Sequence, residues 1–179
     1  MSYCLRKVIY DDKDLIIDYI NEMYIYNSEI NGVGRLQDYI NSNINDFDGW
    51  FNKIKNDEKD IIPKICYVFI DNSSNRLLGM VNIRMTENLL DYPYGNVGYS
   101  IRPLERMKGL GKLQFFYALK EMKINNLSKC IMSCNENNTY SRRIIESSYG
   151  EYIKNIGDER YYKIDVIDAL NKLSKIYEK

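Results

Sequence analysis

The chain has 179 residues, which is enough for one domain with a full hydrophobic core and too few for two comfortable ones. Its 25 lysines and arginines balance 25 aspartates and glutamates, which argues against a broad nucleic-acid or anionic-membrane surface but leaves room for a local basic site. There is no histidine, which excludes a Ser-His-Asp or Cys-His nucleophile and removes the usual zinc ligand and the usual general base.

The first 60 residues predict a strand followed by helices. Residues 3–10 have strand character, and the acidic residues that follow them are typical of a helix start. Apolar residues then recur at helical spacing at Leu15, Ile16, Tyr19, Ile20 and Met23. The sequence NGVG at residues 31–34 interrupts the chain, and weaker helical patterns follow near residues 36–42 and 47–54.

The middle of the chain predicts three strands and a helix. Residues 65–71 and 76–85 are apolar and are separated by the turn sequence NSSN, which predicts a hairpin. A loop then leads into a third strand at residues 96–101. A helix is expected to begin at the two glycines that follow and to run to about residue 125.

The last third of the chain predicts a strand at residues 129–134, a helix over residues 137–148, a terminal hairpin around Gly157 and a helix at residues 166–177. Strands and helices are mixed along the chain, with a strand–helix–strand unit over residues 96–134. This order favours a three-layer α/β or α+β domain with parallel pairing at its centre.

No targeting segment and no metal site are expected. No apolar run approaches the roughly 20 residues of a membrane span, and the N-terminal segment turns acidic where an export signal would stay apolar. Four cysteines lie in apolar, strand-like segments without the spacing of metal ligands, namely Cys4, Cys66, Cys130 and Cys134. They are typical of reduced core residues, so we expect a cytoplasmic protein.

The most informative segment is IRPLERMKGLGKLQ at residues 101–114, where an apolar strand gives way to a helix through two glycines and several basic residues. Main-chain N–H groups at a helix N-terminus bind anions, because the first four have no intrahelical partner and the helix dipole adds positive charge. Glycine lets such a backbone approach a phosphate closely. The segment lacks the ending of a Walker A loop and the third glycine of a dinucleotide fingerprint. A pyrophosphate site and an ordinary turn with a solvated basic edge both stay open.

Arg106-x-x-Gly109-x-Gly111 resembles the Q/R-x-x-G-x-G/A signature of the GNAT superfamily of acetyl-CoA-dependent N-acetyltransferases. Three longer blocks are similar, in order, to a bacterial group of predicted GNAT acetyltransferases: YGNVGYSIRPLERMKGLG, CNENNTYSRRIIESSYG and RYYKID. Upstream, NGVGRL, Trp50 and LLGMVNIRM also fall in the expected order, so the likeness covers nearly the whole chain. It implies a single GNAT domain over residues 1–179, of mixed α/β class. The central sheet would be mostly antiparallel, with one parallel splayed strand pair and helices on both faces.

The resemblance also implies acetyl-CoA as the co-substrate and no metal. The pantetheine arm is expected between the splayed strands, bound by the main chain near Ser100, Ile101 and Arg102. The pyrophosphate is expected on the N–H groups of the glycine segment, whose residues are Arg106, Met107, Lys108, Gly109, Leu110, Gly111 and Lys112. Further cofactor contacts are implied at Asn138, Ser141 and Arg142.

The catalytic acid and base stay open. Many family members have a tyrosine that protonates the leaving thiolate where this chain has Ile145. Tyr140 is a nearby alternative, although a thiolate with a solution pKa of about 8.5 needs little help and water would serve. The candidates for the general base are Glu87, Asp91, Tyr92, Tyr94 and Ser100, with Glu87 preferred and a plain surface-loop role as its alternative. The bacterial group has histidine where this chain has Asn96, and Cys134 is expected to be a buried thiol.

The acceptor site is implied between residues 24 and 50, together with the terminal hairpin near Gly157. The aromatic residues of that region are Tyr24, Tyr26, Tyr39, Phe47 and Trp50, and such residues are usually part of the core. The acidic residues are Asp38, Asp46 and Asp48, which would attract a cationic amine or would lie in a solvated loop.

The expected function is direct transfer of an acetyl group from acetyl-CoA to a primary amine of a small molecule, peptide or protein. The alternative is a catalytically inactive CoA-binding module of the same fold that acts through partners. A nucleotide-triphosphate or nucleic-acid protein is disfavoured by the missing Walker features and the zero net charge. No nucleic-acid or membrane partner is expected, and a homodimer is left open.

Overall fold

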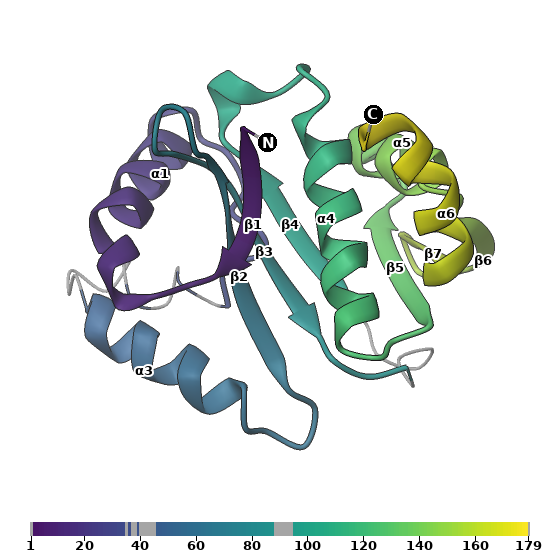
Figure 1. Cartoon of the computed structure of the whole chain (residues 1–179), viewed down its shortest axis with the longest axis horizontal. Coiled ribbons are helices and arrows are strands. Elements are labelled where there is room, and N and C mark those ends of the chain that lie inside the picture. Colours follow the sequence, from purple (N-terminus) through teal and green to yellow (C-terminus); the bar gives the residue numbers. More distant parts are fainter. Residues whose placement is uncertain (1, 35, 37–38, 40–45, 88–94, 179) are drawn as a thin grey trace. The chain divides into compact units, whose positions relative to one another are not determined.

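The computed structural model describes residues 2–34, 36, 39, 46–87 and 95–178 (Figure 1). The chain forms two compact units, one of Met1–Arg84 with Gly98–Leu110 and one of Met85–Val97 with Gly111–Lys179. Each unit contains its own helices and most or all of one sheet. A single domain over the whole chain stays a prediction.

The first unit is built on a four-stranded sheet in the order β1-β2-β3-β4 (Figure 1). Its strands are β1 (Tyr3–Lys7), β2 (Lys64–Asp71), β3 (Arg76–Arg84) and β4 (Val97–Ile101). β1 pairs antiparallel with β2, which pairs antiparallel with β3. The predicted hairpin is therefore confirmed, and β4 lies at the end of the strand order.

Helices α1 (Lys13–Ile25) and α3 (Phe47–Asp57) supply the core of this unit. α1 contacts β3 and α3 contacts β2. The buried cluster takes Ile16, Tyr19, Ile20 and Met23 from α1, Phe47, Trp50 and Ile54 from α3, and Cys66, Val68, Ile70, Leu77 and Met80 from the sheet. Positions 66, 68 and 70 share one face of β2 because side chains alternate along a strand. Each large side chain removed from water stabilises the fold by about 1.5–3 kcal/mol.

The strand predicted over residues 3–10 ends at Lys7, because the chain turns into a short 3-10 helix, η1 (Tyr10–Asp12). The carboxylate of Asp12 accepts the main-chain N–H of Ile9 at 2.9 Å. It also binds both terminal nitrogens of Arg6, at 2.8 and 2.6 Å. These bonds direct the chain into α1, so the predicted strand was too long at its C-terminal end.

The second unit contains α4 (Leu110–Ile124), β5 (Lys129–Asn135), α5 (Thr139–Ser147), β6 (Glu151–Ile156), β7 (Glu159–Asp165) and α6 (Val166–Tyr177). Its sheet has the order β5-β7-β6, and both strand pairs are antiparallel. α4 and α6 meet through the rings of Phe116 and Tyr177, whose centroids are 5.1 Å apart. The predicted terminal hairpin is confirmed, with Gly157 at a φ of +57° in its turn.

The predicted fold class, a mixed α/β arrangement with largely antiparallel sheets, is confirmed. β4 ends the strand order of the first sheet and β5 begins that of the second, and the expected parallel splayed pair stays a prediction. The helix expected near residues 36–42 falls mostly outside the described residues. In the described part of the chain, none of the helices has the length and apolar character needed to cross a membrane.

Candidate functional site

The glycine loop, residues 106–109, joins the short 3-10 helix η2 (Pro103–Glu105) to α4. Met107 and Gly109 have φ angles of +62° and +79°, so the backbone reverses its handedness twice before the helix begins. Successive N–H groups in such a turn form a concave anion site. Apart from the two adjoining residues, no atom of the described part of the chain lies within 4 Å of the position that a Cβ on Gly109 would take, which leaves room for a bound group there. The loop therefore suits the phosphate site that the sequence suggests.

The side chain of Arg106 is directed away from an anion role. Its Nε donates to the main-chain oxygen of Ile101 at 2.9 Å, and its Nη2 donates to the hydroxyl of Ser28 at 2.5 Å. The guanidinium therefore ties the glycine loop to β4 and to the segment after α1. The expected contribution of Arg106 to the phosphate site is reduced to its main chain.

Arg102 is a buried structural residue. Its side chain is held by Glu22 and Asp18, both at 2.9 Å, and its Nε donates to the oxygen of Leu77. Its main-chain N–H donates to the oxygen of Leu78 on β3.

Main-chain N–H and C=O groups alternate in direction along β4. Those of Ser100 therefore also point towards β3, whereas those of Ile101 and Tyr99 point to the opposite edge of the strand. Tyr99 therefore joins Ile101 as a candidate on that edge, and the two-residue period of the strand is a signal that could have indicated it.

Ser100, one of the candidate bases, is held by two hydrogen bonds. Its hydroxyl donates to the main-chain oxygen of Asn31 and lies 2.7 Å from the phenol of Tyr19. Because the single Ser100 proton goes to Asn31, the phenol of Tyr19 is the donor in the second bond. Burial raises the pKa of Tyr19 to about 12, so the phenol stays protonated at neutral pH. Ser100 therefore joins α1, β4 and the segment after α1.

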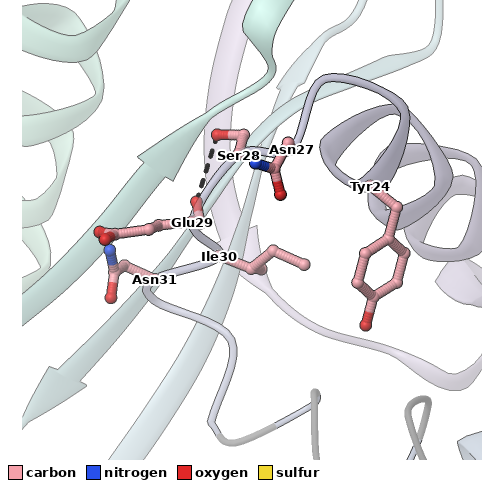
Figure 2. A pocket seen from close by; sticks show the side chains of 6 residues that line it. All are labelled: Tyr24, Asn27, Ser28, Glu29, Ile30 and Asn31. Atoms are coloured by element: carbon pink, nitrogen blue, oxygen red, sulfur yellow. Dashed lines mark hydrogen bonds between the residues drawn. The ribbon is translucent and has the colours of Figure 1, made fainter.

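An open depression of about 570 Å³ lies at the C-terminal end of α1 (Figure 2). It is lined by Tyr24, Asn27, Ser28, Glu29, Ile30 and Asn31. In Figure 2 the side chains of Glu29 and Asn31 lie on one side of the segment and Tyr24 on the other. Ser28 is bound by Arg106 and Asn31 by Ser100, so this depression is connected to β4 and to the glycine loop.

The other residues proposed for the acceptor site are mostly structural. Phe47 and Trp50 are buried, and Trp50 donates to the oxygen of Val33 at 2.8 Å. Asp46 accepts a hydrogen bond from the N–H of Gly49 at the start of α3, and Asp48 accepts one from the phenol of Tyr10. Asp38 lies outside the described residues.

Glu87, the preferred base, is bound at the start of β5. It accepts the main-chain N–H of Ser128 at 2.5 Å and its hydroxyl at 2.7 Å. These hydrogen bonds lower the pKa of Glu87, which makes it a weaker base. The geometry therefore favours the surface-loop role. Asp91, Tyr92 and Tyr94 lie outside the described residues.

Asn96 is fully buried. Its side chain donates to the oxygen of Thr86 at 2.6 Å and accepts the N–H of Ile131 at 2.7 Å. Both partners are main-chain groups, so Asn96 links the segment before β4 to β5.

The first turn of α5 carries the remaining cofactor candidates. The side-chain oxygen of Asn138 accepts the N–H of Ser141 at 3.0 Å and so caps the helix. Arg142 lies 3.9 Å from Glu146, and the side chain of Tyr140 is largely exposed. Ile145 is completely buried, so its position cannot present an acid to a substrate.

Cys134 belongs to the core of the second unit. It is 5% exposed, and burial is the main reason that the pKa of its thiol is raised. The expectation of a buried thiol agrees with this environment.

The chain has the fold of the GNAT N-acetyltransferases. Its structure matches RimJ from Mycobacterium smegmatis, in complex with CoA-disulfide, with a TM-score of 0.77 and 12% identity over 97% of this chain and 88% of that one. It matches FdhC, a nucleotide-linked sugar GNAT, with a TM-score of 0.69 and 13% identity over 99% and 93%. It matches the dodecameric spermidine N-acetyltransferase of Vibrio cholerae with a TM-score of 0.68 and 17% identity over 96% and 98%. No protein-family model matches the sequence, and no curated protein matches it either.

Proposed function

We propose that the protein is a GNAT enzyme that transfers an acetyl group from acetyl-CoA to a primary amine. The observation that carries this proposal is the glycine loop, in which Met107 and Gly109 adopt positive φ angles immediately before α4. A helix start without a side-chain cap, preceded by turned N–H groups and followed by Lys112, suits a diphosphate. The similarity in fold to RimJ in complex with CoA-disulfide supports the same ligand class.

Main-chain groups of the protein would hold the cofactor. The N–H groups of residues 107–112 would bind the pyrophosphate, and the edge of β4 that faces away from β3, at Ile101 and Tyr99, would bind the amides of the pantetheine arm. Gly109 keeps the loop free of side-chain atoms where the phosphates would lie. When bound, acetyl-CoA supplies the acetyl group as a thioester.

The acceptor would enter through the depression formed by residues 24–31. A primary amine has a pKa of about 10.4 and must lose a proton before its nitrogen can attack. Ser100 and Glu87 are engaged in hydrogen bonds, so we assign the proton transfer to water in this open depression. Tyr140, with an exposed phenol, stays the candidate for returning a proton to the thiolate. The chemical identity of the acceptor is left as a primary amine of a small molecule, peptide or protein.

The alternative is a CoA-binding module without transfer activity. It is favoured by one set of observations: Ile145 is buried at the position of the usual acid, and Ser100 and Glu87 hold structural hydrogen bonds. In that case the depression would be an interaction site for a partner.

Two measurements test the proposal in sequence. Isothermal titration calorimetry should detect binding of CoA and acetyl-CoA in preference to ATP. Thiol release from acetyl-CoA should then be measured with a panel of amines, including spermidine and a peptide N-terminus. Binding with turnover on any amine supports the enzyme, binding without turnover favours the module, and the absence of binding contradicts both.

A further inference from the structure

The glycine loop has little packing of its own. Met107 is 80% exposed, and a Cβ on Gly109 would meet no atom of the described residues within 4 Å other than its chain neighbours. Both residues also have positive φ angles, which an L-residue such as Met107 adopts only at a cost of about 1–2 kcal/mol. The conformation of the loop must therefore depend on the segments that flank it.

The upstream flank is anchored to one buried carboxylate on α1. Glu22 is 9% exposed, and its Oε2 accepts hydrogen bonds from Arg102 at 2.9 Å and from Arg76 at 3.1 Å. Its Oε1 accepts the main-chain N–H of Leu104 at 3.2 Å. One side chain thus fixes β3, the residue that follows β4 and the 3-10 turn that leads into the loop.

The contacts of Glu22 belong to a longer chain of alternating charges. Arg76 also lies 3.2 Å from Glu105, and Glu105 lies 2.8 Å from Lys108 in the loop. At the other end, Arg102 lies 2.9 Å from Asp18. Because the side chain of Arg102 is only 3% exposed, these carboxylates are needed to offset the cost of burying its positive charge.

We propose that Glu22 is a positioning residue for the CoA-binding loop, an inference that rests on the proposed function. A loop already held in its binding conformation loses less freedom when the ligand binds. Without the Glu22 carboxylate, the turn at Leu104 loses its charged acceptor and Arg76 loses the link that aligns Glu105 and Lys108. The loop then samples other conformations, and CoA affinity falls although no ligand contact has been removed.

The chain contains a matched control at the start of α1. Asp12 is 2% exposed, binds Arg6 through two hydrogen bonds and accepts the main-chain N–H of Ile9. It is therefore a buried carboxylate of the same kind, paired with arginine and one N–H group. Its partners lie in β1 and just after it, and none belongs to the segment around the glycine loop.

The test compares Glu22→Gln with Asp12→Asn. CoA dissociation constants are measured by calorimetry at a temperature where circular dichroism shows both variants folded, and hydrogen exchange is followed in a peptide covering the glycine loop. Both variants should melt at a lower temperature. Only Glu22→Gln should raise the Kd for CoA, at least tenfold, and speed exchange in the loop, while Asp12→Asn stays within twofold of wild type. Equal changes in both variants, or none in Glu22→Gln, would overturn the proposal.

Arg76→Met keeps the test decisive if Glu22→Gln does not fold, because the Arg76 side chain is 40% exposed. We expect a severalfold higher Kd for CoA, a matching rise in the KM for acetyl-CoA with little change in kcat, and recovery in Arg76→Lys. An unchanged Kd in Arg76→Met would also overturn the proposal. Wild-type protein that binds no CoA would contradict the proposed function itself, whereas wild-type binding with insensitive variants would contradict the positioning role alone.

Discussion

Helices α4 and α5 both follow a strand but begin with different chemistry. α5 begins after Asn138, whose side-chain oxygen accepts the N–H of Ser141. α3 and α6 begin in the same way, after Asp46 and Asp165. α4 begins after Gly109, which has no side chain that could accept a hydrogen bond. A side-chain cap stabilises a helix by about 1 kcal/mol relative to alanine but by only a few tenths of a kcal/mol relative to glycine, so the start of α4 gives up little stability by having no side-chain cap.

The difference separates polar groups that are hydrogen bonded within the protein from polar groups that a ligand would bind. Ser100 and Glu87 are hydrogen bonded to groups of their own unit, and so is Asn96. At α4 the groups left over are main-chain N–H groups, whose geometry depends on the turn before the helix. The candidate site is therefore formed mainly by backbone.

Placing an acidic residue just before α4 should have the largest effect. In Gly109→Asp, a carboxylate would occupy the anion site. Two like charges about 4 Å apart repel by roughly 4 kcal/mol near a protein surface, so CoA binding should weaken by about two orders of magnitude or more. Calorimetry measures the affinity. Gly157→Asp is the control, because Gly157 also has a positive φ and open space at its Cβ, and its CoA affinity should match wild type.

The buried phenol of Tyr19, which is hydrogen bonded to Ser100, is tested by Tyr19→Phe at high pH. The phenol has a pKa of about 12 in the folded state and about 10 when unfolded, so folding holds the proton more tightly. This contribution to the free energy of unfolding is fully present below pH 10. It falls by about 2–3 kcal/mol as the pH rises towards 12. Urea unfolding from pH 9 to 12 should show a steeper loss of stability in wild type than in Tyr19→Phe. Parallel curves would mean that the phenol is not buried as described.

Removing the cap of α5 should have a smaller effect. Asn138→Ala and Asp165→Ala each delete one side-chain cap, so each should lower the free energy of unfolding by about 1 kcal/mol. The proposal that Asn138 also contacts the pantetheine arm adds a second expectation. Only Asn138→Ala should raise the Kd for CoA, by severalfold, and equal affinities in the two variants would reduce Asn138 to a helix cap.

The smallest effect is expected at the other end of α5. Tyr149 has a φ of +64° just after the helix, a conformation that costs an L-residue about 1–2 kcal/mol. The centroid of its ring lies 4.6 Å from the Lys172 ammonium, and this cation–π contact stabilises the fold by about 0.5 kcal/mol. Tyr149→Gly should therefore raise the free energy of unfolding by about 0.5 kcal/mol in urea titrations. A loss of stability would show that the ring contributes more than its backbone costs.

The elements of the fold were predictable from local patterns. The apolar runs of β2 and β3 and the turn between them place the hairpin correctly, and the glycines place the start of α4. The C-terminal end of β1 could not be predicted, because it depends on the hydrogen bonds of Asp12 with Ile9 and Arg6. Residue type alone does not predict such contacts.

The partners of the site residues were not predictable in the same way. Arg106 meets Ser28, 78 positions away, and Glu22 meets Arg102, 80 positions away. Glu22 could have been noticed, because it lies three residues after Tyr19 and beside Met23 on the apolar face of α1, where a carboxylate needs a partner. The depression after α1 depends on how that segment crosses β4, where Gly32 leaves no room for a Cβ.

The central claim is that main-chain N–H groups of residues 107–112, in the glycine loop and the first turn of α4, bind the diphosphate of CoA. The most direct measurement is a titration of ¹⁵N-labelled protein with CoA, followed through the assigned amide resonances. The account predicts that the largest shifts fall on Met107 to Lys112 and on Ile101, with much smaller shifts at the start of α6. Saturable CoA binding that leaves residues 107–112 unperturbed would contradict it.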